Sequence, residues 1–151
     1  MGQIPEELHN IIQNTADAKH LEIINVYDLT DPRCAGIGPS EFVYLVDQAQ
    51  MVYTDSFHGT VFSILMNKPF FVINRVEKGM ENMSSRIDTL LDLFHMQDRY
   101  LKPEDHYQYQ GERKFNMDFR CVGEIQKHEQ VKLEAYIRML LHRSSKAYES
   151  A

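Results

Sequence analysis

Apolar and polar residues alternate along the first part of the chain in blocks that predict helices and strands in turn. Residues 5–19 begin with a proline and two glutamates and then place apolar side chains three or four positions apart, which is typical of an amphipathic helix. Residues 21–28 are rich in β-branched residues and predict a strand. A loop dense in glycine and proline follows. Pro39 or Ser40 can start a second helix, whose apolar stripe lies within residues 41–50.

The same alternation continues through the middle of the chain. We expect a short strand at 51–54, a helix at 56–67 and a third strand at 69–74. The third strand is an almost unbroken apolar run, which suits a strand buried on both faces of a parallel sheet. This order of elements predicts an α/β fold built on a doubly wound parallel sheet. Three clear strands are fewer than an open sheet usually has, which suggests half of a larger architecture or a fragment whose partner domain is missing.

Longer polar stretches separate the elements of the second half. Residues 75–85 are interpreted as a polar loop and residues 84–96 as a helix. Residues 102–121 have weak periodicity and are expected to be loop or short strands. A final helix is expected over 124–147, and its apolar face carries Leu133, Tyr136, Ile137, Leu140 and Leu141.

Length, charge and cysteine content narrow the class of protein. The 151 residues suffice for a single α/β domain, and a net charge of −6 argues against binding to the phosphate backbone of nucleic acid. Cys34 and Cys121 lie far apart without the spacing of metal ligands, so we expect reduced thiols and no metal site. No apolar run is long enough to span a membrane and no signal-peptide pattern is present, so a cytoplasmic location is expected.

Polar side chains follow two of the expected strands at their carboxyl ends, where open α/β sheets bind ligands. Asp55, Ser56 and His58 follow the first of these strands. Helix starts offer free N–H groups and a positive dipole end, an imidazole can transfer a proton, and Arg86 can form a bidentate contact. The pattern therefore predicts an anion site with proton transfer beside it. The second strand and the loop after it contribute Asn74, Arg75, Asn82, Ser84, Ser85 and Arg86.

Each of these residues also has a plainer interpretation. Asp55 or Ser56 is at least as well explained as the N-cap of the next helix. A single histidine at a helix start is usually structural, and Arg86 after two serines is typical of a solvated residue in a first helical turn. On the pattern alone both interpretations stay open.

Residues 49–70, AQMVYTDSFHGTVFSILMNKPF, resemble the signature of the polysaccharide pyruvyl transferase family, in which a strand, a histidine turn, a helix and a second strand follow one another. Two flanking stretches, 38–49 and 84–101, are also similar to the family, so that the resemblance covers residues 37–101. The positions that match within the signature are Ala49, Val52, Thr54, His58, Gly59, Thr60, Ser63, Ile64, Leu65, Lys68, Pro69 and Phe70.

The resemblance implies transfer of a pyruvyl group from phosphoenolpyruvate to a pair of sugar hydroxyls, giving a ketal in surface polysaccharide synthesis. It also implies a Rossmann-like sheet similar to the C-terminal domain of a glycosyltransferase B-type fold, with the N-terminal domain absent. By resemblance, His58 is the general acid/base or a phosphate ligand, Gly59 and Thr60 donate hydrogen bonds to the same anion, and Arg86 is a secondary contact. The implied partners are phosphoenolpyruvate as donor substrate and a saccharide or lipid-linked sugar as acceptor, with no cofactor.

One position departs from the family pattern. Many members carry an arginine two residues before the histidine, where this chain has Ser56. The change weakens phosphoenolpyruvate binding or moves the arginine's role to Arg75 or Arg86. Two alternatives therefore remain, a non-catalytic module that binds a sugar phosphate and a glycosyltransferase that uses a nucleotide sugar. Without the first domain the chain alone is not expected to turn over, and the apolar face of its last helix would be exposed and promote dimerisation.

Overall fold

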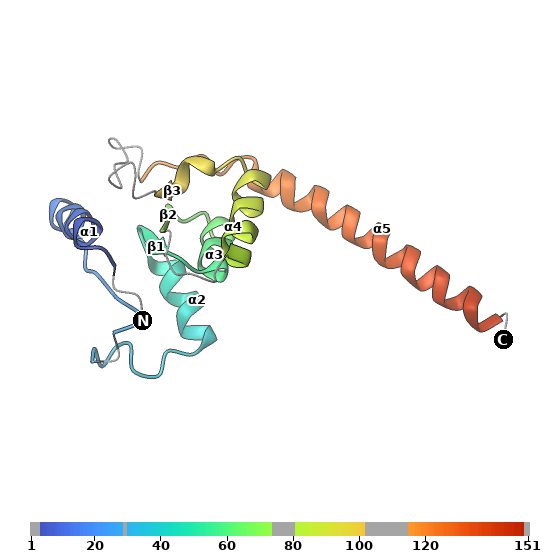
Figure 1. Cartoon of the computed structure of the whole chain (residues 1–151), viewed down its shortest axis with the longest axis horizontal. Coiled ribbons are helices and arrows are strands. Elements are labelled where there is room, and N and C mark those ends of the chain that lie inside the picture. Colours follow the sequence, from blue (N-terminus) through green and yellow to red (C-terminus); the bar gives the residue numbers. More distant parts are fainter. Residues whose placement is uncertain (1–3, 29, 74–80, 102–114, 150–151) are drawn as a thin grey trace. The chain divides into compact units, whose positions relative to one another are not determined.

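The computed structural model shows the chain as two compact units, Met1–Met117 and Asp118–Ala151 (Figure 1). The first unit holds a small sheet with its helices, and the second holds one long helix. The described residues are 4–28, 30–73, 81–101 and 115–149, without the side chains of 81–84 and 140–149.

From residue 39 onward, helices and strands alternate along the described chain as the sequence predicts. The predicted helices at 5–19, 41–50, 56–67 and 124–147 and the strands at 51–54 and 69–74 are confirmed, with ends that differ by at most two residues. In chain order the elements are α1 (Glu6–Lys19), α2 (Pro39–Gln48), β1 (Val52–Thr54), α3 (Phe57–Leu65), β2 (Phe70–Ile73), α4 (Glu81–Leu93), the 3-10 helix η1 (Gln97–Arg99), β3 (Tyr100–Leu101) and α5 (Val122–Glu149).

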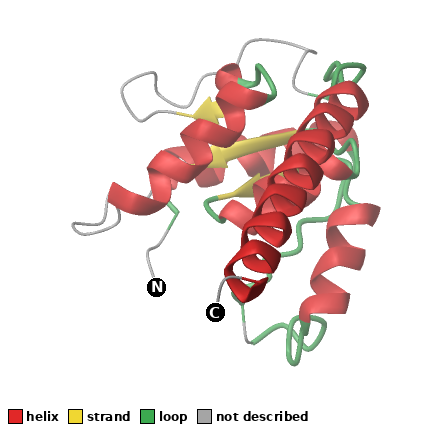
Figure 2. Cartoon of the chain, turned by 90° about the vertical axis from the view of Figure 1, so that its right-hand side faces the viewer, coloured by secondary structure: helices red, strands yellow, loops and turns green. Residues whose placement is uncertain are grey.

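The three strands form one parallel sheet in the order β1–β2–β3. Figure 2 draws the strands in yellow. Val52 lies opposite Phe70, and Val72 lies opposite Tyr100. Parallel neighbours need a crossover connection, and α3 supplies it between β1 and β2. The prediction of an α/β fold with a parallel sheet is confirmed.

One face of the sheet packs against α1. Leu8 of α1 is fully buried in a cluster with Phe71, Ile73 and Leu101. The ring centroids of Tyr53 and Phe71 lie 5.7 Å apart within this layer. Because successive strand residues point to opposite faces, the neighbours of Tyr53 and Phe71 in the sequence point away from α1.

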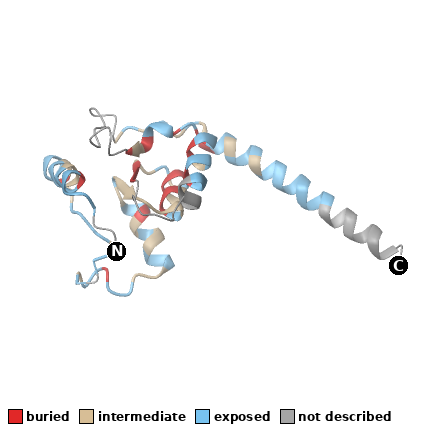
Figure 3. Ribbon diagram, in the orientation of Figure 1, coloured by how far each residue is buried: buried red, intermediate tan, exposed pale blue. Residues whose placement is uncertain are grey.

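The opposite face packs against α3, which in turn contacts α2 and α4. The rings of Phe42 in α2 and Phe62 in α3 meet edge to face, with centroids 6.3 Å apart. Figure 3 shows that buried residues gather on the strands and on the helices beside them. Cover on both faces explains why every residue of β2 is buried.

The prediction of a strand at 21–28 is wrong, because these residues form loop and turn. The Asn25 side chain accepts a hydrogen bond from the Tyr27 N–H at 3.1 Å, and the Asn25 carbonyl accepts one from the Asp28 N–H at 2.9 Å. These bonds close a turn within the predicted strand, as asparagine side chains often do. Ile23 and Ile24 stay exposed, so the β-branched residues here do not mark a buried strand.

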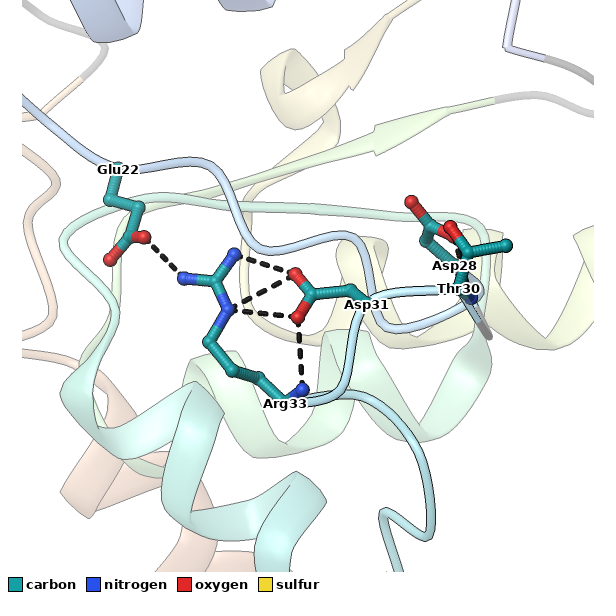
Figure 4. Close-up of polar contacts among 5 residues, drawn as sticks. All are labelled: Glu22, Asp28, Thr30, Asp31 and Arg33. Carbon is teal, nitrogen blue, oxygen red and sulfur yellow. Dashed lines mark hydrogen bonds and ion pairs between the residues drawn. The ribbon is translucent and has the colours of Figure 1, made fainter.

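Charged side chains order the loop that follows (Figure 4). Asp28 accepts hydrogen bonds from the N–H and the hydroxyl of Thr30, at 2.9 and 2.6 Å. The Arg33 guanidinium donates to both oxygens of Asp31, with Nη2 2.6 Å from Oδ2, and also contacts Glu22. The Thr30 hydroxyl lowers the pKa of Asp28, and the Arg33 side chain lowers the pKa of Asp31. Local polar contacts therefore shape this segment.

The helix α4 begins earlier than predicted. Its first residue is Glu81, so the part of the predicted polar loop from 81 to 85 is helical. The first turn of α4 is polar, and the apolar spacing that marks a helix begins only at Ile87. No sequence pattern predicts β3, because two residues are too few for a periodicity. The remaining residues of two predicted loops, 75–80 and 102–114, lie outside the described part of the chain.

The second unit is built on α5, which spans 28 residues. Its described side chains include Leu133, Tyr136 and Ile137 of the predicted apolar face, and all three are exposed. The side chains of Leu140 and Leu141, also predicted on that face, lie outside the described residues. Within the part of the chain that the structure describes, no helix combines the length and apolar character needed to cross a membrane.

Candidate functional site

The candidate site lies where β1 ends and α3 begins. Ser56, between them, has an extended backbone (φ −94°, ψ 133°), and its Oγ accepts a hydrogen bond from the Gly59 N–H at 3.4 Å. Its own N–H donates to Thr54 Oγ1 at 3.1 Å. Ser56 is therefore the N-cap of α3, which is one of the two interpretations that its sequence position left open.

Gly59 is the point at which α3 touches the sheet. A Cβ on this glycine would lie 3.0 Å from Thr54 Cβ and 3.3 Å from Thr54 Cγ2, and closer still to Thr54 Oγ1. Glycine in a helix costs about 1 kcal/mol relative to alanine, and here it permits a close approach of helix and strand. The glycine after the histidine therefore has a packing role in this fold.

Two buried hydroxyls are hydrogen-bonded to backbone carbonyls near the same helix start. Thr60 and Ser63 are both fully buried. Thr60 Oγ1 donates to the Ser56 carbonyl at 3.0 Å, and Ser63 Oγ donates to the Gly59 carbonyl at 2.8 Å. The Gly59 N–H and the Thr60 hydroxyl are thus engaged within the protein in this conformation.

The N–H groups of Phe57 and His58 are the first two of α3, so they have no acceptor within the helix. Together with the positive end of the helix dipole, such groups favour an anion. The His58 side chain is exposed beside them. The helix start therefore offers backbone donors next to an accessible imidazole.

The Phe57 ring connects His58 with Arg86 of α4. The His58 ring centroid lies 5.9 Å from that of Phe57 at an interplanar angle of 80°, and the Arg86 Cζ lies 5.4 Å from the Phe57 centroid. An arginine over an aromatic face is held by cation–π attraction. The structure therefore brings two of the predicted site residues to one ring, from two different helices.

The other predicted residues are placed differently. Ser85 is exposed on α4, and its carbonyl accepts a hydrogen bond from Thr89 Oγ1 at 2.8 Å. Since α4 begins at Glu81, Ser85 and Arg86 do not form the helix start that the sequence predicted, and lie about one turn further along. Arg75 lies outside the described residues.

Phe57 is a residue that sequence reasoning missed. Its neighbours Ser56 and His58 carry groups that can bind or react with a ligand, whereas a phenyl ring carries none. Its contact with Arg86 joins residues 29 positions apart in the chain. Only the folded arrangement of α3 and α4 reveals it.

The other reactive groups that the structure describes do not point to a second chemistry. Among the described residues, no group of three or more histidine, cysteine or acidic side chains could hold a metal ion. Burial raises the pKa of the Cys34 thiol, which disfavours the reactive thiolate. Burial likewise raises the pKa of the Tyr53 phenol, an effect that the nearby Thr15 hydroxyl partly opposes. Among the described residues, the imidazole and guanidinium beside Phe57 therefore remain the candidate pair.

Comparison with models of protein families matches residues 5–75, slightly less than half of the chain, to the family described as polysaccharide pyruvyl transferase. The match runs from α1 past the end of β2 and includes the start of α3 with His58, whereas Arg86 lies beyond it. No curated protein and no solved structure matches the chain significantly. Over residues 5–75 the chain is thus similar to the polysaccharide pyruvyl transferase family, which supports the resemblance found in the sequence.

Proposed function

We propose that this chain forms part of an enzyme that transfers a pyruvyl group from phosphoenolpyruvate to a pair of sugar hydroxyls in surface polysaccharide synthesis. The observation that carries the proposal is the exposed His58 at the start of α3, inside the stretch that matches the family. Phosphoenolpyruvate carries a carboxylate and a phosphate, and a helix start suits both.

In the proposed reaction His58 donates a proton to the methylene carbon of phosphoenolpyruvate. One sugar hydroxyl adds to the adjacent carbon, and a second hydroxyl then replaces the phosphate, which leaves as inorganic phosphate. The products are a pyruvate ketal and one phosphate per transfer. Of the two protons that the hydroxyls lose, one returns to His58 and the other leaves with the phosphate. The reaction involves no net oxidation or reduction, so the proposal needs no redox cofactor.

The anion is proposed to bind at the N–H groups of Phe57 and His58 and at the Arg86 guanidinium. Ser56 fixes the start of the helix, and the contacts of Gly59 and Thr60 support a role in packing. Arg75 and Ser85 are kept as candidates for secondary contacts. The acceptor, a saccharide or lipid-linked sugar, is proposed to bind between this Rossmann-like unit and a second domain, as in glycosyltransferase B-type folds. Because the donor is a cytoplasmic metabolite, a cytoplasmic location is proposed as well.

A titration of the chain with phosphoenolpyruvate, followed by amide NMR, tests the donor site. We expect shifts concentrated at residues 56–60 and at Arg86, and a dissociation constant about tenfold higher for His58→Ala, because a charge-assisted hydrogen bond is lost. The matched control is His9→Ala, since His9 is also an exposed helical histidine and lies on α1. Shifts elsewhere, or equal affinity in the two variants, would count against the site.

A non-catalytic module that binds a sugar phosphate is the second candidate. It is favoured by one observation, that Ser56 occupies the place of the family's arginine and is engaged in capping α3. In such a module His58 and Arg86 would bind the anion without proton transfer. A glycosyltransferase that uses a nucleotide sugar would instead show tight binding of that sugar and none of phosphoenolpyruvate.

Ser56→Arg restores the arginine of the family pattern and tests whether the phosphate lies at this position. We expect it to lower the dissociation constant for phosphoenolpyruvate about tenfold, because a guanidinium forms two parallel bonds with a phosphate. Ser56→Ala is the control, since it removes the same cap at a cost of about 1 kcal/mol in stability without adding charge. If the arginine variant binds no better than the alanine variant, the phosphate does not lie at this position.

A further inference from the structure

Phe57 takes part in the candidate site with both its backbone and its ring. Its N–H is the first of α3 and lies at the proposed anion position. Its ring contacts α4, where the Arg86 Cζ lies 5.4 Å from the ring centroid. Phe57 is partly buried, whereas Arg86 is exposed. The ring is therefore the more confined of the two side chains.

The backbone that carries this ring is held against the sheet. Ser56, the residue before it, donates its N–H to Thr54 Oγ1 at 3.1 Å and accepts the Gly59 N–H at 3.4 Å. Gly59 packs so closely on β1 that a Cβ there would lie 3.0 Å from the Thr54 Cβ. The helices α3 and α4 also contact each other. Position 57 is thus fixed from both sides along the chain, and its ring is a firm support for a side chain of α4.

We propose that Phe57 is a positioning residue, which holds the Arg86 guanidinium beside the anion at the start of α3. The inference rests on the proposed function, because the anion is the carboxylate or phosphate of the donor. A guanidinium within about 6 Å of a ring centroid is attracted to the ring. A phenyl ring carries no negative charge and no lone pair. The contact with Phe57 by itself therefore neither neutralises Arg86 nor takes up its N–H groups.

The advantage of this contact is order before binding. An exposed arginine samples many rotamers, and an anion that binds it must restrict that freedom, which weakens binding. A ring that already restricts the guanidinium reduces this loss. Phe57 is therefore expected to act on the affinity for the anion through Arg86, without contacting the reacting atoms.

Phe57→Leu tests this role, because leucine removes the ring and leaves the N–H of position 57 in place. We expect a dissociation constant about two- to fivefold higher for phosphoenolpyruvate, and for inorganic phosphate as a second probe, the usual effect of losing an exposed cation–π contact. Phe57→Tyr keeps an aromatic face and should retain the original affinity. If circular dichroism shows that Phe57→Leu does not fold, Phe57→Met replaces it.

The matched control is Phe62→Leu. Phe62 is also a partly buried phenylalanine of α3, and its ring meets that of Phe42 in α2 at a centroid distance of 6.3 Å. This variant loses an aromatic contact with a different helix, so it should leave the affinity for both anions unchanged. Equal weakening by the two leucine variants would assign Phe57 a packing role and overturn the proposal.

An Arg86→Gln background separates positioning from a direct effect of the ring on the anion. There Phe57→Leu should have no further effect, because the residue through which the ring acts is absent. The same loss of affinity in both backgrounds overturns the positioning role.

NMR of the protein without ligand gives a measurement that does not depend on binding. The ring current of Phe57 should displace the signal of the Arg86 Nε–H proton, and Phe57→Leu should abolish this displacement whereas Phe62→Leu should not. An Arg86 signal that is the same in Phe57→Leu overturns the proposal. Binding at residues 56–60 with equal affinity in the original protein and Phe57→Leu overturns the positioning role alone. Absence of binding to either anion by the original protein overturns the proposed donor site and, with it, this role.

Discussion

Replacing Gly59 with alanine is expected to lower the free energy of unfolding of the α/β unit by about 2–3 kcal/mol, the upper part of the range for overpacked sites. The added methyl group would overlap Thr54, which lies at the end of β1 and cannot retreat without moving the strand. Alanine is the better helix former by about 1 kcal/mol, so propensity alone predicts the opposite sign. Urea unfolding of the two proteins, followed by circular dichroism, measures the difference.

Gly123→Ala is the matched control for this prediction. Gly123 lies in the first turn of α5, and a Cβ there would meet no atom within 4 Å. This variant should be neutral or stabilise the helix by up to about 1 kcal/mol. Thr54→Ala provides a second check, since it removes two of the three atoms that crowd position 59. Gly59→Ala should cost less in that background, and additive effects of the two changes would contradict direct contact.

Replacing His58 with alanine is expected to lower the rate of pyruvyl transfer by about 10²- to 10⁴-fold, the usual contribution of a general acid. The loss should fall mainly on kcat, because proton donation matters in the transition state, whereas loss of Arg86 should fall mainly on KM. The assay is phosphate release with phosphoenolpyruvate and a saccharide acceptor, using the protein together with its proposed second domain. His9→Ala should retain full activity.

The kinetic constants of His58→Ala distinguish a role in catalysis from a role in binding. Activity of His58→Ala within a few-fold of the original protein would show that the proton comes from another group. Unchanged kcat with a raised KM would assign His58 to anion binding alone. If circular dichroism shows that His58→Ala does not fold, His58→Gln replaces it in the assay, because glutamine keeps a polar side chain of similar size.

The central elements of the fold were predictable because their signals are local. The apolar run from Phe70 to Ile73 and the helical spacing around Ile87 both follow from the sequence alone. The loop structure of residues 21–28 was not predictable in this way, because β-branched residues favour a strand only where another strand pairs with them. There the side chain of Asn25 closes a turn instead.

The candidate site was predictable in its chemistry but not in its arrangement. A histidine and glycine after a strand mark a helix start, and the family resemblance added a role for His58. Packing between elements decides two features of the site. The Ser56 hydroxyl accepts a hydrogen bond from the Gly59 N–H, and the ring of Phe57 contacts both His58 and Arg86. Contacts between residues far apart in the chain leave no trace in local periodicity.

The close contact of α3 with β1 makes the two halves of the site unequal. His58 belongs to a helix that is bonded through Ser56 to Thr54 and packed on the same residue through Gly59. Arg86 reaches the ring of Phe57 from another helix by a long side chain with several rotatable bonds. Adjusting the position of Arg86 to a differently shaped ligand therefore costs much less free energy than moving His58. Over evolution, α4 is where ligand preference can change while His58, the proposed proton donor, keeps its position.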